Sequence, residues 1–136
     1  MLAGFSPIAR REIVTRGLGT CVEEAMGLSL DECDGVFLSV DVDVVDPGMA
    51  PGTGTPEPGG LTSRQFLDII RRLVFELPVV GVDIVEVYPP YDHAEITAMP
   101  GNRIVLEALC GIAARGRGDT WQPARPLLEG RGTAAQ

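Results

Sequence analysis

The sequence predicts an α/β fold built around a parallel sheet. Two apolar, β-branched runs, residues 36–44 and 78–87, have the composition of buried strands and are flanked by glycine or proline. Each run is followed by a loop and then by a segment whose apolar residues have helical spacing, 61–77 and 102–114. Repetition of strand, loop and helix is typical of parallel sheets covered by helices.

The first predicted strand, VFLSVDVDV, runs from Val36 to Val44 and ends before Asp46-Pro47. In a strand, successive side chains point to opposite faces of the sheet. Alternation therefore places Val40, Val42 and Val44 on one face, and Ser39, Asp41 and Asp43 on the other.

The helix that follows is predicted by a capping box, because Thr62 and Gln65 are three residues apart. Apolar residues then recur at helical spacing until Pro78 ends the helix. They are Phe66, Ile69, Ile70 and Leu73.

The remaining elements are predicted from shorter signals. The second strand extends from Pro78 to Val87, and the helix after it from Asn102 to Ala114, with Pro100-Gly101 marking its start or a break. Residues 1–35 indicate a short helix between Val22 and Leu28. Residues 115–136 are rich in Arg, Gly and Pro and predict a flexible tail.

Composition limits the function. A chain of 136 residues has room for one domain, and its formal net charge of -8 disfavours a nucleic-acid partner. Cys21, Cys33 and Cys110 lie too far apart in the sequence to suggest a disulfide framework or a zinc site. Without a signal sequence or a membrane-length apolar run, a soluble cytoplasmic protein is expected.

Asp41 and Asp43 are the first candidates for chemistry, since ligands of parallel sheets bind at the carboxyl ends of the strands. Two neighbouring carboxylates repel each other unless a cation binds between them. The alternative is that both are solvated and that Asp46 caps the turn.

The Gly/Pro-rich loop 47–60 favours a rigid wall beside a ligand. Within this loop, Thr53 and Thr55 either present their hydroxyls to the ligand or form local hydrogen bonds in the turn.

The second strand carries two more acids. By alternation Asp83 and Glu86 lie on opposite faces, and Glu86 is nearer the carboxyl end. A carboxylate there could bind a guanidinium group through two parallel hydrogen bonds, although an acid taken alone is more often paired or solvent-facing. His93, the chain's one histidine, falls in the following loop, where a structural or solvated role is usual.

Two blocks of the sequence carry long motifs. Residues 39–64 read SVDVDVVDPGMAPGTGTPEPGGLTSR, which has the form S-x-D-x-D-x-x-D-P followed by P-G-T-G-T-P and G-G-L-T, and residues 82–98 read VDIVEVYPPYDHAEITA. The first block resembles the ureohydrolase family, which includes arginases and agmatinases, and the second is similar to the agmatinase branch in particular. The resemblance covers residues 36–114, and it is carried by motifs long enough to be specific.

The resemblance implies a three-layer α/β/α fold of the arginase type and a centre of two manganese ions that hydrolyses a guanidino substrate to urea. It implies that Asp41 bridges both ions, that Asp43 binds one, and that Ser39 lies next to these ligands without binding the metal itself. It also implies that Glu86 binds the guanidinium group, with Thr55 beside it. Full-length relatives are expected to be homo-oligomers.

The chain departs from the family pattern, since neither the G-G-D-H block nor the D-A-H-x-D block occurs. These blocks supply the histidines and further aspartates of the metal centre. Residues 1–114 therefore resemble the C-terminal part of an agmatinase-like domain, and no catalytic residue is assigned. The expected function is hydrolysis of agmatine by the full-length form. The alternatives are a guanidinobutyrase-type activity, or an inactive remnant that acts as a binding or assembly module.

Overall fold

The computed structural model describes residues 6–31 and 33–119. These residues divide into two compact units, one ending at Cys33 and the other beginning at Asp34. In the first unit, α1 (Arg10–Arg16) and α2 (Leu18–Ser29) follow each other through Gly17, whose φ of 88° lies in the region that favours glycine. The helix predicted at 22–28 is thus part of a longer one, and α1 was not predicted.

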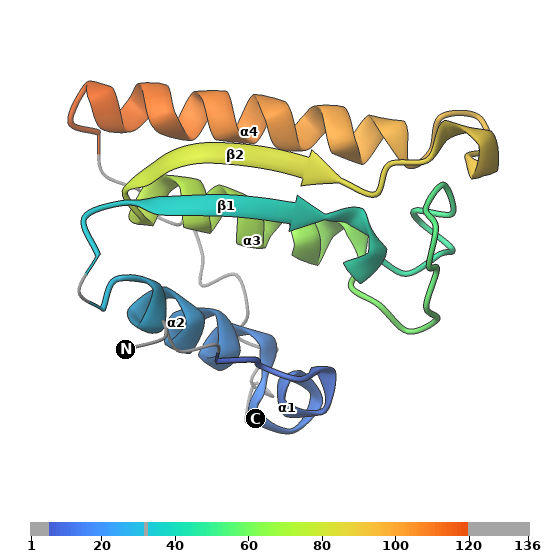
Figure 1. The fold of residues 1–136 in the computed structure, drawn as a ribbon, viewed down its shortest axis with the longest axis horizontal. Coiled ribbons are helices and arrows are strands. Elements are labelled where there is room, and N and C mark those ends of the chain that lie inside the picture. The colour runs from blue at the N-terminus through green and yellow to red at the C-terminus, as the bar shows by residue number, and fades with distance from the viewer. Residues whose placement is uncertain (1–5, 32, 120–136) are drawn as a thin grey trace, which may run out of the picture. The chain divides into compact units, whose positions relative to one another are not determined.

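The second unit has the predicted α/β order (Figure 1). Strands β1 (Val36–Asp41) and β2 (Val79–Val85) pair in parallel and alternate with helices α3 (Ser63–Glu76) and α4 (Ala98–Gly116). A helical crossover between two adjacent strands is the usual way to make them parallel. The prediction of an α/β fold with parallel strands is confirmed.

Strand β1 is shorter than predicted, and the reason lies in its last side chain. The Asp41 carboxylate accepts a hydrogen bond from the Asp43 N–H at 2.9 Å, which turns the chain into the 3₁₀ turn Val42–Val44. The prediction that Val44 continues the face of Val40 and Val42 was wrong: its side chain is 44% exposed, whereas Val42 is buried. Asp41 therefore ends the strand, whereas Asp43 follows the geometry of the turn and not strand alternation.

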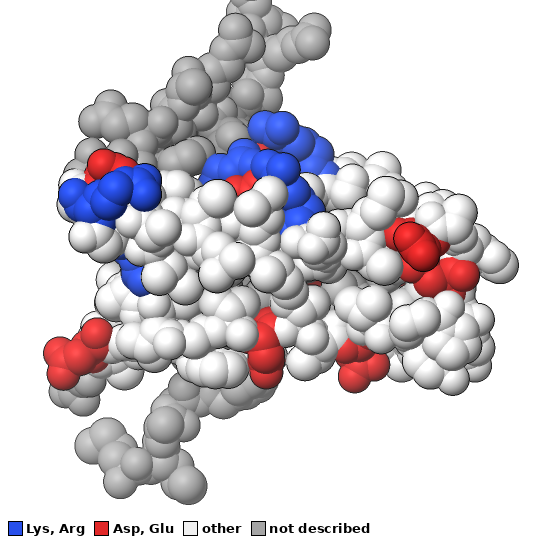
Figure 2. All heavy atoms as spheres, turned by 90° about the horizontal axis from the view of Figure 1, so that it is seen from above, with Lys and Arg blue, Asp and Glu red and all other residues white. Residues whose placement is uncertain are grey.

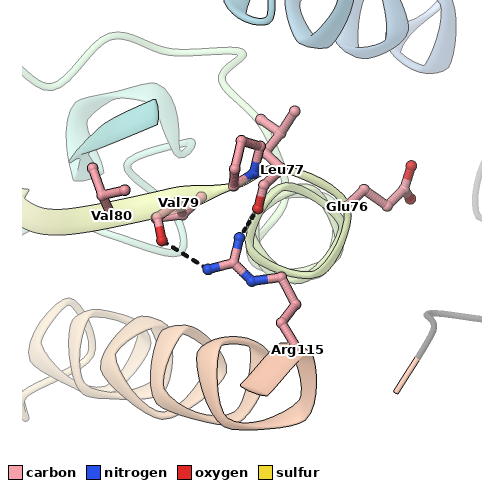
Figure 3. A pocket seen from close by; sticks show the side chains of 6 residues that line it. Glu76, Leu77, Val79, Val80 and Arg115 are labelled. Carbon is pink, nitrogen blue, oxygen red and sulfur yellow. Dashed lines mark hydrogen bonds between the residues drawn. The ribbon is translucent and has the colours of Figure 1, made fainter. Parts of the chain in front are cut away.

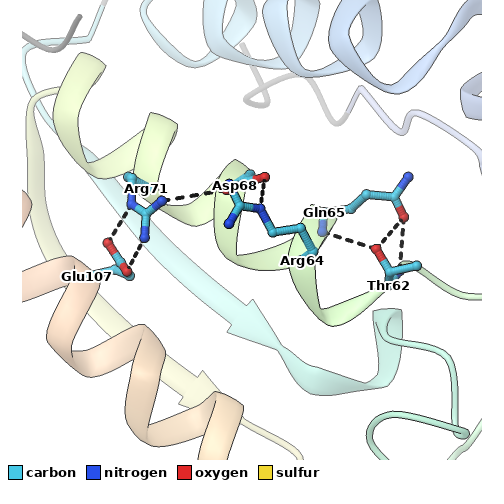
Figure 4. Close-up of polar contacts among 6 residues, drawn as sticks. All are labelled: Thr62, Arg64, Gln65, Asp68, Arg71 and Glu107. Carbon is cyan, nitrogen blue, oxygen red and sulfur yellow. Dashed lines mark hydrogen bonds and ion pairs between the residues drawn. The ribbon is translucent and has the colours of Figure 1, made fainter. Parts of the chain in front are cut away.

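Helix α3 begins as predicted (Figure 4). The Thr62 hydroxyl accepts from the Gln65 N–H at 3.2 Å, and the Gln65 side chain accepts from the Thr62 N–H at 2.9 Å. This reciprocal bonding satisfies N–H groups that the first turn of a helix leaves free. Phe66, Ile70 and Val74 are buried on the face that packs against the sheet.

Helix α4 begins earlier than predicted. Pro100 does not interrupt it, because the helix starts at Ala98 and the first turn needs no intrahelical N–H bonds. Gly101, expected to mark a start or break, is buried within the helix. The expectation of an interruption at this pair was wrong.

At its other end α4 continues to Gly116, and Arg115 fastens it to the start of β2 (Figure 3). The Arg115 guanidinium donates to the Leu77 carbonyl oxygen and, at 2.7 Å, to that of Val79. A shallow, open pocket surrounds this contact; its lining is Glu76, Leu77, Pro78, Val79, Val80 and Arg115. The rest of the predicted tail, residues 120–136, lies outside the described residues.

Helices α3 and α4 pack side by side and share one core with the sheet. They approach closely at Gly111, where an added Cβ would lie 2.5 Å from Val74 Cγ2. Buried Glu107 of α4 links the two helices by accepting from Arg71 of α3 (Figure 4). It also accepts from Arg103, one turn away on α4. The Arg71 guanidinium, together with that of Arg103, holds the pKa of Glu107 below its usual value despite burial.

The outer side of α4 is largely apolar. Figure 2, seen from above relative to Figure 1, shows charged side chains gathered in separate places with uncharged surface between them. The exposed apolar residues on α4 are Met99, Val105, Leu106, Leu109 and Ile112. Nevertheless, within the part of the chain that the structure describes, no helix combines the length and apolar character needed to span a membrane.

Candidate active site

The two strands end side by side and bring together acids from distant parts of the sequence. Asp41, the last residue of β1, pairs with Val85, the last residue of β2, and Glu86 comes directly after it. The register explains this proximity, because parallel strands with aligned ends place their carboxyl termini at the same edge. Asp41 is half-buried, whereas Glu86 is exposed.

Asp43 is held from one side by a loop hydroxyl. Thr55 Oγ1 donates to Asp43 Oδ2, across twelve residues of sequence. The other carboxylate oxygen, Asp43 Oδ1, is buried and has no hydrogen-bond partner among the described residues. A buried carboxylate oxygen without a donor is costly, and a bound cation would satisfy it.

The Gly/Pro loop is closed at its base by Asp46. Its two carboxylate oxygens accept from the Gly48 N–H at 2.9 Å and from the Gly59 N–H at 2.7 Å. Where the loop ends, the Leu61 N–H donates to the Val44 carbonyl oxygen at 2.8 Å. The expected turn-capping role of Asp46 is thus present, and the loop is an ordered Ω-type loop.

Gly60 shows why this closure requires glycine. An added Cβ there would lie 2.6 Å from both the Asp46 nitrogen and the Val44 carbonyl oxygen, both of which are backbone atoms. Any side chain would push the ends of the loop apart. The loop could not then hold Thr55 against Asp43.

Glu86 lies in a strained backbone conformation. Its φ of 64° is in the left-handed region that non-glycine residues rarely adopt. Strand β2 ends at Val85, so strand alternation does not extend to Glu86, and its placement on the face opposite Asp83 stays a prediction. Its carboxylate lies beside the loop, because a Cβ added at Gly54 would be 3.5 Å from Glu86 Oε2.

Other predicted residues take simpler positions. Ser39 is exposed on β1 and pairs with Asp83 of β2, two residues before Asp41 on the same face of the sheet. His93 is exposed in the loop before α4, and its carbonyl oxygen accepts from the Ile96 N–H at 3.2 Å. Thr53, in contrast, is 1% exposed, and its hydroxyl finds no partner within the described ranges.

Sequence analysis missed a group of residues that joins the two loops. The Gly52 N–H donates to the buried Thr97 hydroxyl at 2.7 Å, and Asp92 accepts from the N–H groups of Thr97 and Ala98. Burial acts to raise the pKa of the Asp92 carboxyl, but these N–H donors outweigh it and hold that pKa below its usual value. An Asp shortly before a helix start is a capping signal that could have drawn attention to it.

Asp41 and Asp43 fit a divalent cation only as part of its ligand set. Their hard oxygen donors and the buried, unpartnered Asp43 Oδ1 are suited to manganese. Among residues 6–31 and 33–119, however, no group of three or more His, Cys, Asp or Glu could hold a metal ion. Further ligands must come from elsewhere for a complete centre.

Comparison with known proteins shows the class to which this fold belongs. The arginase family model matches residues 2–111, and the chain belongs to the arginase family. Over 75 residues it is 53% identical to an agmatinase of Chromobacterium violaceum, which covers 55% of this chain and 23% of that protein. The resemblance to the ureohydrolase family is confirmed.

Solved structures show the same fold. A hypothetical agmatinase from Burkholderia thailandensis has a TM-score of 0.69 and 37% identity, covering 78% of this chain and 32% of that one. Proclavaminate amidino hydrolase from Streptomyces clavuligerus has a TM-score of 0.69 and 42% identity, covering 78% and 35% respectively. The arginase-like fold class is confirmed, and the chain spans about a quarter to a third of the length of these relatives.

Proposed function

We propose that residues 34–119 carry one side of an agmatinase-type active site, in which Asp41 and Asp43 bind manganese and Glu86 receives the guanidinium group of the substrate. The complete enzyme would hydrolyse a guanidino compound, with agmatine favoured, to an amine and urea. Two manganese ions would acidify bound water and neutralise the charge that develops during hydrolysis. The residues that the structure describes supply too few ligands for that centre.

A single observation carries this proposal: Asp43 Oδ1 is buried without a hydrogen-bond partner in the described part of the chain. It lies at the strand edge where Asp41 ends β1. Ordinary structural aspartates are satisfied by donors, as both oxygens of Asp46 are here. An oxygen kept free of donors in a buried position is suited to a cation.

The likeness to an agmatinase of Chromobacterium violaceum supports agmatine as the substrate. Glu86 supports a guanidinium ligand, since a carboxylate can bind that planar cation through two parallel hydrogen bonds. Its left-handed backbone is the kind of strain that is retained at functional sites. The near-equal TM-scores for the agmatinase and the amidino hydrolase leave guanidino acids as a second substrate class.

The second candidate function is a binding or assembly module without turnover. The shortage of metal ligands among the described residues favours it. In that case the two aspartates would bind manganese no better than other surface acids.

Manganese binding to the intact 136-residue chain separates these functions. Isothermal titration should detect manganese binding in the wild type. In Asp43→Asn the affinity should be at least about tenfold lower, because the amide lacks the negative charge and one oxygen ligand. Asp34→Asn is the matched control, since Asp34 is exposed and precedes the opposite end of β1. Equal affinities for the two variants would favour the binding module.

A chimera tests turnover. The 75 residues of this chain that align at 53% identity with the Chromobacterium violaceum agmatinase would replace the matching segment of that protein. With manganese, the chimera should release urea from agmatine faster than from arginine or guanidinobutyrate. A folded chimera that releases no urea from any of the three would refute the enzymatic proposal.

A further inference from the structure

Gly52 is the point at which the Gly/Pro loop meets the segment between β2 and α4. Its N–H donates to Thr97 Oγ1 at 2.7 Å, and its carbonyl oxygen accepts from the Tyr88 N–H at 2.8 Å. Gly52 and Thr97 are both buried. Each loop thus satisfies backbone groups of the other away from water.

There is no room for a side chain at this contact. A Cβ added to Gly52 would lie 2.5 Å from Asp92 Cβ and 2.9 Å from Asp92 Cα. Because Asp92 Cα belongs to the backbone, rotation of a side chain could not relieve the clash. The loop therefore rests directly on Asp92, and only glycine permits that approach.

Asp92 in turn fixes the position of Thr97. Its Oδ1 accepts from the Thr97 N–H at 2.9 Å, and its Oδ2 accepts from the Ala98 N–H at 3.0 Å. These N–H groups are free at the start of α4, and an ionised carboxylate is a strong acceptor for them. With its backbone held in this way, Thr97 presents its hydroxyl to Gly52.

Both halves of the candidate site lie a few residues from this contact. Three residues after Gly52, the Thr55 hydroxyl binds Asp43. Two residues before Tyr88, Glu86 holds its left-handed backbone. A shift of the Gly52 contact would therefore move the loop hydroxyl and the strand-end acid relative to the two aspartates.

We propose that Asp92 and Thr97 are positioning residues that lock the loop at Gly52, and so set Thr55 and Glu86 relative to the two aspartates. This inference rests on the proposed function for its purpose, although the lock itself can be tested without metal or substrate. Neither residue is a catalytic residue, since both act through Gly52.

Conservative variants of Thr97 isolate the hydrogen bond. Thr97→Val keeps the shape of the side chain but removes the acceptor, whereas Thr97→Ser keeps the acceptor. Amide hydrogen exchange at Gly52 and Tyr88 should accelerate about tenfold or more in Thr97→Val, because a buried donor is left unpaired. In Thr97→Ser it should stay within about twofold of the wild type. Thr15→Val, at an exposed threonine of α1, is the control.

Metal binding provides a second measurement on the same samples. To broaden the Asp43 amide signal, about tenfold more manganese should be needed in Thr97→Val and no more in Thr97→Ser, because loss of one supporting contact typically weakens metal sites by about tenfold or more. If the wild type shows no broadening, the proposed function fails, while hydrogen exchange still decides the lock. Unchanged exchange at Gly52 and Tyr88, or equal acceleration throughout residues 34–119, would overturn the lock.

Asp92→Asn covers the case in which Thr97→Val does not fold. The amide keeps one oxygen acceptor but loses the charge, so exchange at Gly52 should be faster than in the wild type and in Thr97→Ser. Wild-type exchange at Gly52 in Asp92→Asn would also refute the inference.

Discussion

Replacing Gly111 with alanine tests the packing that holds the second unit together. The new Cβ would lie 2.5 Å from Val74 Cγ2 and 3.1 Å from the Val74 carbonyl carbon, so both a side chain and a helix backbone must move. Overpacking of this kind destabilises by about 1–3 kcal/mol, from which a helix-propensity gain of about 1 kcal/mol must be subtracted. Because Val74 is fully buried and has no free space to move into, we expect the overpacking cost to lie in the upper part of that range, about 2–3 kcal/mol, which leaves a net loss of about 1–2 kcal/mol.

Urea unfolding followed by circular dichroism measures this loss through linear extrapolation. Gly116→Ala is the control in the same helix, because an added Cβ there meets nothing within 4 Å. In the double variant Gly111→Ala/Val74→Ala the 2.5 Å contact with Val74 Cγ2 is gone, so the double variant should lose less stability than the sum of the losses in the two single variants. Wild-type or greater stability of Gly111→Ala would refute the close approach of α3 and α4.

Three further predictions concern stability. Thr62→Ala should lower the free energy of unfolding by about 1 kcal/mol through loss of the helix cap, as measured by urea unfolding, whereas a change below a few tenths would contradict it. Arg71 lowers the pKa of Glu107 in the folded state, so ionised Glu107 should stabilise the fold. This stabilisation should be complete above the unfolded-state pKa of about 4.3 and should disappear as the pH falls through the lower folded-state pKa. Glu107→Gln should flatten that part of the pH profile of the urea midpoint, and an unchanged profile would refute the assignment. Gly60→Ala should destabilise by about 2 kcal/mol or more by clashing with the Val44 carbonyl, and an unchanged melting temperature would refute this loop closure.

Local patterns in the sequence were sufficient for the regular elements. The capping pair at Thr62 and the spacing of apolar residues after it predicted α3, because each signal operates within one or two helical turns. The two apolar runs likewise predicted parallel strands, and the motif from Ser39 onward indicated the family. The strand-end position of Asp41 followed from the same local reading.

Element ends depended on contacts that spacing does not show. The side chain of Asp41 bonds back to the chain and ends β1, whereas two-residue periodicity carried the strand on to Val44. Pro100 was taken as a marker of a start or break, although the first turn of α4 accommodates it. In both cases the energy of a few specific hydrogen bonds decided the outcome.

The sequence by itself determined the family, the order of strands and helices, and the acids Asp41, Asp43 and Glu86 as candidates. Only the tertiary structure decided how these acids and their loop are positioned. The Thr55 hydroxyl donates to Asp43, and the Gly52 N–H donates to Thr97 from a distant segment. The physical reason is range. Periodicity and capping act between neighbours along the chain, whereas a buried oxygen without a donor, or a glycine pressed against another backbone, exists only once segments dozens of residues apart have packed together.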